Sequence, residues 1–193
     1  MCTSPSLSGM RWKAKTSRRP PTHASSNRQT RITAHSTSVI CQDVELKGDI
    51  TVGAGTVIHP KATILAIGGP IVMGSDCVVE EMAIIVNRNK GIMRIGDDNM
   101  FMVASRVESP SIGDSNTFQP RSKASSAVTI SDHCTLSANT ILLPLGTDHE
   151  TLPPYTVVYG EDSSRRTWDG SGQDAERGLR AKHVEYLREV IPK

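Results

Sequence analysis

The chain has 193 residues, of which 37% are hydrophobic and only 4% aromatic, a length suited to one domain of ordinary size. No uninterrupted apolar run approaches the roughly 18 to 20 residues of a membrane-spanning helix, and nothing resembles a secretory signal, so a membrane-spanning protein is excluded. The formal net charge of +2 conceals two unlike parts.

The basic and acidic residues are unevenly distributed. Residues 1–42 contain seven basic residues and no acidic one, whereas the remainder carries 15 basic and 20 acidic residues, a net of −5. Residues 1–33 are rich in Ser, Thr, Arg and Pro and too poor in apolar residues to fold alone. We expect a disordered basic leader over 1–33, with an over-extended gene start and a mitochondrial transit peptide as the alternatives. The acidic body argues against nucleic-acid binding, which needs a basic patch on the folded part.

The four cysteines are widely separated. Cys2, Cys41, Cys77 and Cys134 form no Cys-x-x-Cys pair, so neither a zinc knuckle nor a small disulfide framework is indicated. We expect buried thiols that act as small hydrophobic side chains in a reducing compartment.

A six-residue period runs from Ala34 to about Tyr159. Large apolar residues recur in this register, and four residues after most of them the chain places a small one. Large side chains at one inward position and small ones at the other suit a narrow stacked interior. The large positions are Ile40, Leu46, Val52, Ile58, Ile64, Met73, Val79, Ile85, Ile95, Phe101, Val107, Ile112, Phe118, Ile130, Leu136, Leu142, Leu152 and Val158.

The repeats group in threes, which gives one turn per roughly 18 residues. A glycine column follows the first position of successive triplets and indicates either a positive φ or a close approach between coils. That column consists of Gly53, Gly74, Gly96 and Gly113. The period is interrupted after Ile64, Ile85 and Leu142, always between the third position and the next first one. The insertions should therefore project from one corner of the stack.

These periods fit neither an amphipathic helix nor a half-buried hairpin sheet. We predict an all-β fold: a parallel β-helix of triangular section with about seven coils over residues 34–160. A polar linker should occupy 161–172, and a C-terminal α-helix 173–193. Apolar residues near one face of that helix should pack along the stack or over its end. They are Ala175, Leu179, His183, Tyr186, Leu187, Val190 and Ile191.

Several segments carry a family resemblance. They are residues 46–62 (LKGDITVGAGTVIHPKA), 69–74 (GPIVMG), 79–85 (VEEMAII), 156–160 (TVVYG) with Arg165 and Arg166, and 186–192 (YLREVIP). The chain resembles the dynactin subunit 6 family within the hexapeptide-repeat, left-handed β-helix superfamily, and this likeness alone implies the left hand. It also implies a non-catalytic structural subunit of the dynactin pointed-end subcomplex, which supports dynein-driven transport along microtubules and cargo-adaptor attachment.

The resemblance further implies a heteromeric assembly in the cytoplasm and cytoskeleton, without cofactors. The partners would be the sister β-helical dynactin subunit 5, an actin-related protein of the pointed end, and dynein or its cargo adaptors. Flat edges and open coil ends suit side-by-side or end-on docking. The candidate interface residues are His59, Lys61, Glu80, Glu81, Tyr159, Arg165 and Arg166.

Two enzymatic interpretations remain as alternatives. A γ-carbonic-anhydrase-like mitochondrial protein would fit the basic leader and the Lys47-Gly48-Asp49 stretch. It needs three histidines converging on zinc, yet His23 and His183 lie outside the repeat and the other four histidines fall at unrelated positions of it. A hexapeptide acyltransferase would need a general-base histidine, and His149 is the only candidate with an adjacent carboxylate. We therefore expect no catalytic, cofactor-binding or metal-binding residues.

Overall fold

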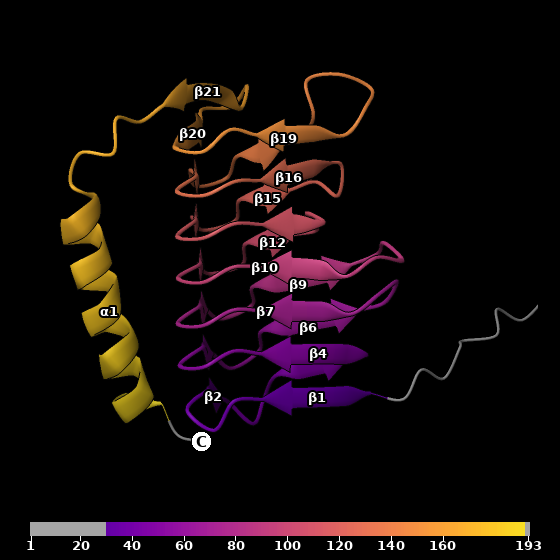
Figure 1. Cartoon of the computed structure of the whole chain (residues 1–193), viewed down its shortest axis with the longest axis vertical. Coiled ribbons are helices and arrows are strands. Elements are labelled where there is room, and N and C mark those ends of the chain that lie inside the picture. Colours follow the sequence, from indigo (N-terminus) through magenta and orange to yellow (C-terminus); the bar gives the residue numbers. More distant parts are fainter. Residues whose placement is uncertain (1–29, 192–193) are drawn as a thin grey trace, which may run out of the picture.

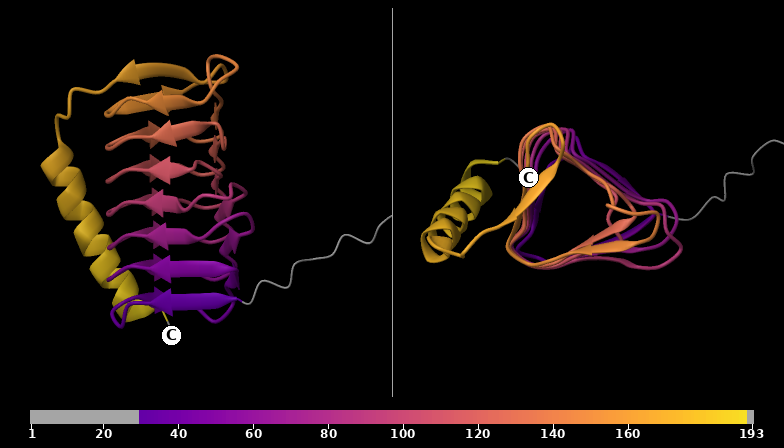
Figure 2. Two further views of the ribbon diagram at one scale, coloured as in Figure 1. Left: turned by 45° about the vertical axis from the view of Figure 1, so that its right-hand side comes forward. Right: turned by 90° about the horizontal axis from the view of Figure 1, so that it is seen from above.

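The computed structural model describes residues 30–191, so the leader expected over 1–33 lies almost entirely outside the described residues. From Arg31 to Tyr159 the chain winds through three parallel sheets that form the sides of a triangular stack, and a helix runs outside it (Figures 1 and 2). No helix within the described range is long and apolar enough to span a membrane.

Each sheet takes one strand from each successive coil. Sheet A contains β1 (Arg31–Ala34), β4 (Asp49–Val52), β7 (Ile71–Met73), β10 (Met93–Ile95), β13 (Ser111–Ile112), β16 (Val128–Ile130) and β19 (Glu150–Leu152). Sheet B contains β2 (Val39–Ile40), β5 (Val57–Ile58), β8 (Val78–Val79), β11 (Met100–Phe101), β14 (Thr117–Phe118), β17 (Thr135–Leu136), β20 (Thr156–Tyr159) and β21 (Ser164–Thr167). Sheet C contains β3 (Glu45–Lys47), β6 (Thr63–Ala66), β9 (Ile84–Asn87), β12 (Arg106–Val107), β15 (Lys123–Ala124) and β18 (Ile141–Leu142). The stack thus has six complete coils and a seventh of two strands.

The predicted interior is confirmed by the burial of the repeat. The large positions of the hexapeptides form one continuous core, in which only Ile40 and Leu46 of the first coil are partly exposed. Phe101 and Phe118, in register on neighbouring strands, stack with ring centroids 4.8 Å apart. Each coil therefore fills the same narrow space with one layer of side chains, as close packing requires.

The corners rest on backbone conformations that non-glycine residues adopt at a cost of about 1 kcal/mol each. At the first corner, between sheets A and B, the residues with positive φ are Gly55, Asp76, Asp98, Ser115, His133 and Tyr155. Their amides bond to the preceding coil; Asp98 N–H, for example, donates to the Ser75 carbonyl over 2.9 Å. These hydrogen bonds between successive coils offset the strain.

The glycine column is required by close approach and not by positive φ. A Cβ on Gly53 would lie 2.3 Å from the Gly74 carbonyl oxygen, and one on Gly96 would lie 2.7 Å from the Gly113 oxygen. No real Cβ is found at such distances, so this column lets neighbouring coils touch. The positive φ occurs two residues later in the chain, at Gly55 and its equivalents.

The insertions project from the third corner, between sheets C and A, as the broken spacing predicted. The loops after β6, β9 and β18 all leave the stack on the side away from the helix (Figure 1). They carry exposed apolar residues, among them Ile67, Ile92 and Leu145. The first corner stays free of long insertions and can accept the helix.

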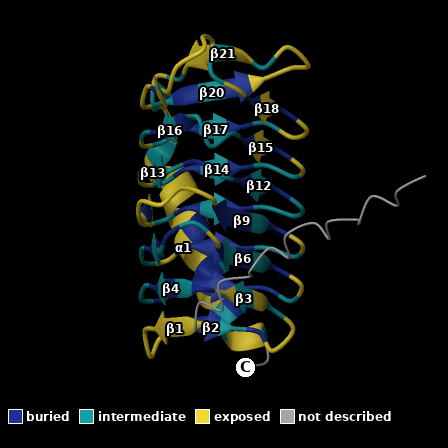
Figure 3. Ribbon diagram, turned by 90° about the vertical axis from the view of Figure 1, so that its right-hand side faces the viewer, coloured by how far each residue is buried: buried dark blue, intermediate teal, exposed yellow. Residues whose placement is uncertain are grey.

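The expected linker over 161–172 contains a strand. β21 pairs antiparallel with β20, with Val158 opposite Arg165, and closes the C-terminal end of the stack. Its sequence, Ser-Arg-Arg-Thr, has no apolar alternation, because both of its faces meet water or polar groups. The first strand likewise begins at Arg31, before the expected start at Ala34. Both terminal strands, β1 and β21, are largely exposed (Figure 3).

Helix α1 (Gln173–Val190) runs back along the stack toward the first coil (Figure 1). Val184 and Leu187 pack on Val39, Val57 and Val78, which are outward-facing residues of sheet B. The expected packing is confirmed for Leu187 and Ile191 and wrong for Leu179, Tyr186 and Val190, which are exposed, whereas Arg180 is buried.

Candidate interaction surfaces

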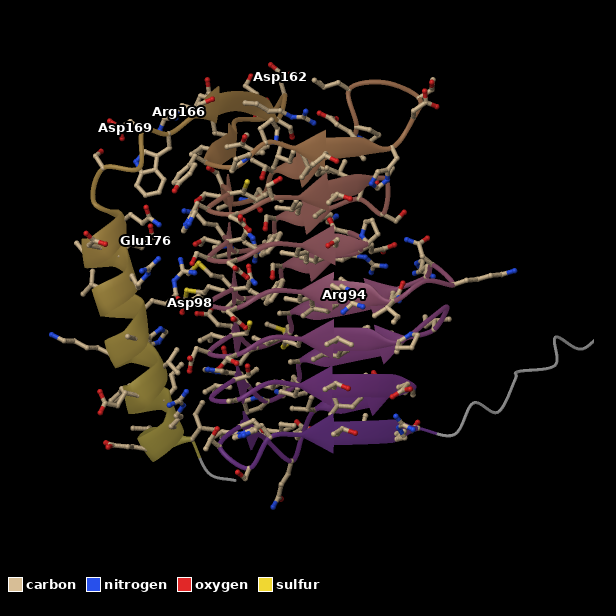
Figure 4. All side chains as sticks on the ribbon, viewed as in Figure 1. Arg94, Asp98, Asp162, Arg166, Asp169 and Glu176 are labelled. Atoms are coloured by element: carbon tan, nitrogen blue, oxygen red, sulfur yellow. The ribbon has the colours of Figure 1, made fainter. Side chains whose placement is uncertain are left out.

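The helix is attached to the first corner by polar side chains. Arg180, 7% exposed, donates to the Asp98 carbonyl and, over 2.8 Å, to Thr117 Oγ1. Arg188 donates to the Gly55 carbonyl over 2.8 Å. The corner presents carbonyl oxygens, so guanidinium groups are the complementary side chains. Figure 4 shows Asp98 at this junction.

Burial raises the pKa of Asp98 above its ordinary value, although Arg180 acts in the opposite direction. The junction also contains Gln173, whose amide lies 3.1 Å from His133 Nε2. His133 stacks on Tyr155 with centroids 4.8 Å apart. The space enclosed by Asp98, His133, Gln173 and Arg180 is only about 20 Å³, too small for a ligand, so these side chains form a structural contact.

Four of the seven candidate interface residues lie together at the second corner, between sheets B and C. His59 Nδ1 is 3.1 Å from Glu81 Oε1, and this hydrogen bond lowers the pKa of the Glu81 carboxyl. Glu80 accepts the Val103 amide over 2.9 Å. His59 is 9% exposed, so it and Glu80 serve the stack itself, while Lys61 is exposed.

The other three candidates lie at the C-terminal end of the stack. Arg165 contacts Glu150 and donates to the Leu143 carbonyl over 2.8 Å, so its side chain is mostly buried. Arg166 lies with its guanidinium carbon 5.5 Å from the ring centre of Tyr159, and both remain exposed. The structure thus separates the candidates into two distant groups.

The contact between Glu150 and Arg165 predicts that the stability of the C-terminal end of the stack depends on pH. The hydrogen bond from Arg165 lowers the pKa of Glu150 below its ordinary 4.5. The stability that it contributes is therefore complete above the unfolded-state pKa and is lost as the pH falls through the folded one. In urea unfolding from pH 7 down to pH 3, Glu150→Gln should show a shallower acid loss than the wild type, whereas exposed Glu161→Gln should not. Equal slopes for all three proteins would contradict the role of the pair.

Sequence comparison identifies the family. The chain is 33% identical over 167 residues to Dynactin subunit 6 of Nematostella vectensis, covering 80% of this chain and 85% of the relative. It belongs to the dynactin subunit 6 family. Dynactin subunit 6 of Dictyostelium discoideum is 30% identical over 158 residues, 82% of its length. No family model matches the chain.

Solved structures that are similar to this chain establish its fold. A hexapeptide transferase family protein from Anaplasma phagocytophilum has a TM-score of 0.70 at 13% identity, covering 82% of this chain and 92% of its own. A putative acetyltransferase from Bacillus cereus has a TM-score of 0.72 at 18% identity, covering 83% and 92%. These similarities confirm the left-handed hexapeptide β-helix. At such low identities they give no evidence about activity.

The residues considered for catalysis in this member of the dynactin subunit 6 family are dispersed. Within residues 30–191 no three His, Cys, Asp or Glu side chains are placed to hold a metal ion. His149 is exposed in the loop after β18, and its Nε2 lies 2.7 Å from Thr129 Oγ1. It therefore has a surface hydroxyl, not a carboxylate, as its hydrogen-bond partner.

Three of the four thiols are buried and unpaired, as expected, while Cys2 lies outside the described residues. Burial raises the pKa of Cys77 to about 12 and that of Cys134 to about 11. Cys77 Sγ lies 3.3 Å from the Gly96 carbonyl oxygen, to which it can donate. Because the thiolate is the nucleophile, these cysteines are inert at neutral pH.

Proposed function

We propose that the chain is a non-catalytic structural subunit of dynactin that belongs to its pointed-end subcomplex and helps to connect the dynein motor with cargo adaptors. The complex would be cytoplasmic and associated with the cytoskeleton. Support comes from relatives in animals and Dictyostelium that are named Dynactin subunit 6 and that align with most of this chain.

The observation that carries the proposal is the difference between the two ends of the stack. The C-terminal end is closed by the chain itself, through β21 and Arg165. The sheets end in one-sided strands at both ends, β1, β2 and β3 at the first coil and β19, β21 and β18 at the last. The two ends differ in the core, because Ile40 and Leu46 of the first coil are only partly buried, whereas the inward residues of the last strands are fully buried. Unpaired strand edges are ready to pair with another chain, and Ile32 beside them is 37% exposed. A protein that closes one end and leaves the other open is suited to end-on assembly.

The expected neighbours are the sister β-helical dynactin subunit 5 and the actin-related protein of the pointed end. We assign the open end to one of them. The exposed candidates Lys61, Glu81, Tyr159 and Arg166 are proposed as further contacts, because their side chains are available at the surface. We do not propose direct partner contacts for His59, Glu80 and Arg165, because their side chains are already hydrogen-bonded within the chain.

Affinity purification of the tagged full chain from its native cell tests the function. We expect dynactin subunits to co-elute, and Ile32→Asp to reduce their recovery severalfold, because a carboxylate beside open strand edges disfavours pairing. Ile92→Asp is the matched control, since Ile92 is 49% exposed in a third-corner loop. Elution without dynactin, accompanied by stoichiometric zinc and carbon dioxide hydration or by coenzyme A binding, would overturn the proposal.

A further inference from the structure

A shallow groove of about 250 Å³ crosses the outer face of sheet C near its C-terminal end. It spans β12, β15 and β18, and the register places Arg106, Lys123 and Ile141 side by side on these successive strands. Glu108 and Leu143 line the same groove. Basic and apolar side chains therefore share one continuous surface.

One end of the groove is apolar and uncovered. Ile141 is 47% and Leu143 57% exposed. β18 is the terminal strand of its sheet, and Ser163 takes the place of a further strand: its Oγ accepts the Ile141 amide over 3.2 Å and donates to the Ile141 carbonyl over 2.8 Å. The strand edge is thereby satisfied without burying these side chains. Clustered exposed apolar residues of this kind mark interaction sites.

The other end of the groove carries excess positive charge. Glu108 bonds Arg106 over 2.6 Å and Arg88 over 3.0 Å. Partial burial alone would raise the pKa of Glu108, but the two guanidinium groups hold it below its ordinary value. Lys123 makes no ion pair with any residue in the described range. Two cations of the groove lining, Arg106 and Lys123, thus face one carboxylate, and Arg88 adds a further guanidinium to Glu108 from outside the lining.

We propose that this groove binds a short acidic, amphipathic segment of a partner protein. Its apolar side chains would cover Ile141 and Leu143, and its carboxylates would pair with Lys123 and Arg106. Strands about 4.8 Å apart separate Arg106 from Ile141 by roughly 10 Å, the length of two helical turns or three extended residues. Charge complementarity selects an acidic occupant, and the inference goes beyond the proposed function because it holds whichever complex the chain joins.

The test uses a fluorescein-labelled peptide of repeated Leu-Glu-Glu and the purified full chain, with binding followed by fluorescence anisotropy. We expect saturable binding that weakens with added salt. Lys123→Glu and Leu143→Ser should each weaken it about tenfold, in line with the loss of one favourable contact. The matched controls are Lys182→Glu and Leu179→Ser, because both residues are exposed on α1, away from the groove; these variants should bind like the wild type.

Three outcomes would overturn the inference. The first is equal binding of a Leu-Lys-Lys peptide, and the second is equal weakening by the α1 controls. The third is retention on phosphatidylserine vesicles without peptide binding, which would assign the groove to a lipid surface. Thermal unfolding of each variant separates lost binding from lost folding. The result is independent of whether dynactin co-purifies, so the two proposals fail separately.

Discussion

Replacing Gly53 by alanine should lower the free energy of unfolding by about 3 kcal/mol or more. The new Cβ would lie 2.3 Å from the carbonyl oxygen and 2.4 Å from the carbonyl carbon of Gly74, both in the backbone of the next coil. A flexible side chain could move aside, but the Gly74 backbone cannot, because it lies between β7 of sheet A and β8 of sheet B. The coils would have to separate at this corner, which would lengthen the hydrogen bonds of sheets A and B. Urea unfolding monitored by circular dichroism measures the loss.

The matched control for this prediction is Gly146→Ala. Gly146 lies in the loop after β18, where an added Cβ would meet nothing within 4 Å. Alanine there reduces the freedom of the unfolded chain, so stability should be unchanged or rise by less than about 1 kcal/mol. If the two variants were equally stable, close approach would not explain the glycine column.

Replacing Arg180 by alanine should detach α1 and cost about 3 kcal/mol, within the range for removing a buried charged donor. Arg180 bonds the Asp98 carbonyl at the corner, Thr117 Oγ1 in β14 and, over 2.7 Å, Glu176 in its own helix. Without it, a buried carbonyl and a cavity would remain under the helix. Hydrogen exchange should accelerate over Gln173–Val190, while the amides of the stack keep their protection.

Two further variants test the geometry of this anchor. Lys182→Ala removes an exposed cation from the same helix and should leave hydrogen exchange unchanged. Arg180→Lys keeps the charge but lacks the planar fork that reaches several acceptors at once, so it should restore only part of the protection. Full protection in Arg180→Ala would show that Val184 and Leu187 hold the helix without it.

The interior was predictable because one rule repeats at every coil. Each large hexapeptide position faces inward, so a period read from Ile40 to Val158 identified the core correctly. The insertion corner followed from the same spacing. The glycine column showed a backbone requirement, but sequence alone could not distinguish positive φ from close approach, since that depends on the distance to the next coil.

The predicted packed face of α1 was only partly right. Leu187 and Ile191 pack on the stack as expected, but the surface under the rest of the helix is not apolar. Leu179 and Tyr186, expected to be packed, are 71% and 60% exposed. The corner opposite the upper half of the helix offers backbone carbonyls, and Arg180 is the residue that satisfies them. Only toward the first coil does an apolar surface, formed by Val39, Val57 and Val78, receive Val184 and Leu187.

The candidate contacts were limited in the same way. His59 and Glu81 are 22 residues apart, and the coil register brings them to 3.1 Å; Arg165 meets Glu150 across the last turn. Charged residues that the sequence suggests are exposed can form pairs with each other in the folded chain.

The uneven distribution of basic and acidic residues and the low aromatic content of 4% are properties of the sequence alone, and so are the β-helical repeat and its family. The repeat could be recognised because a local period, repeated at every coil, determines which residues face inward. The tertiary structure alone decided which end stays open, which helix face is free and where Lys123 meets Ile141. Those features depend on neighbours from different coils, whose pairing no local pattern records.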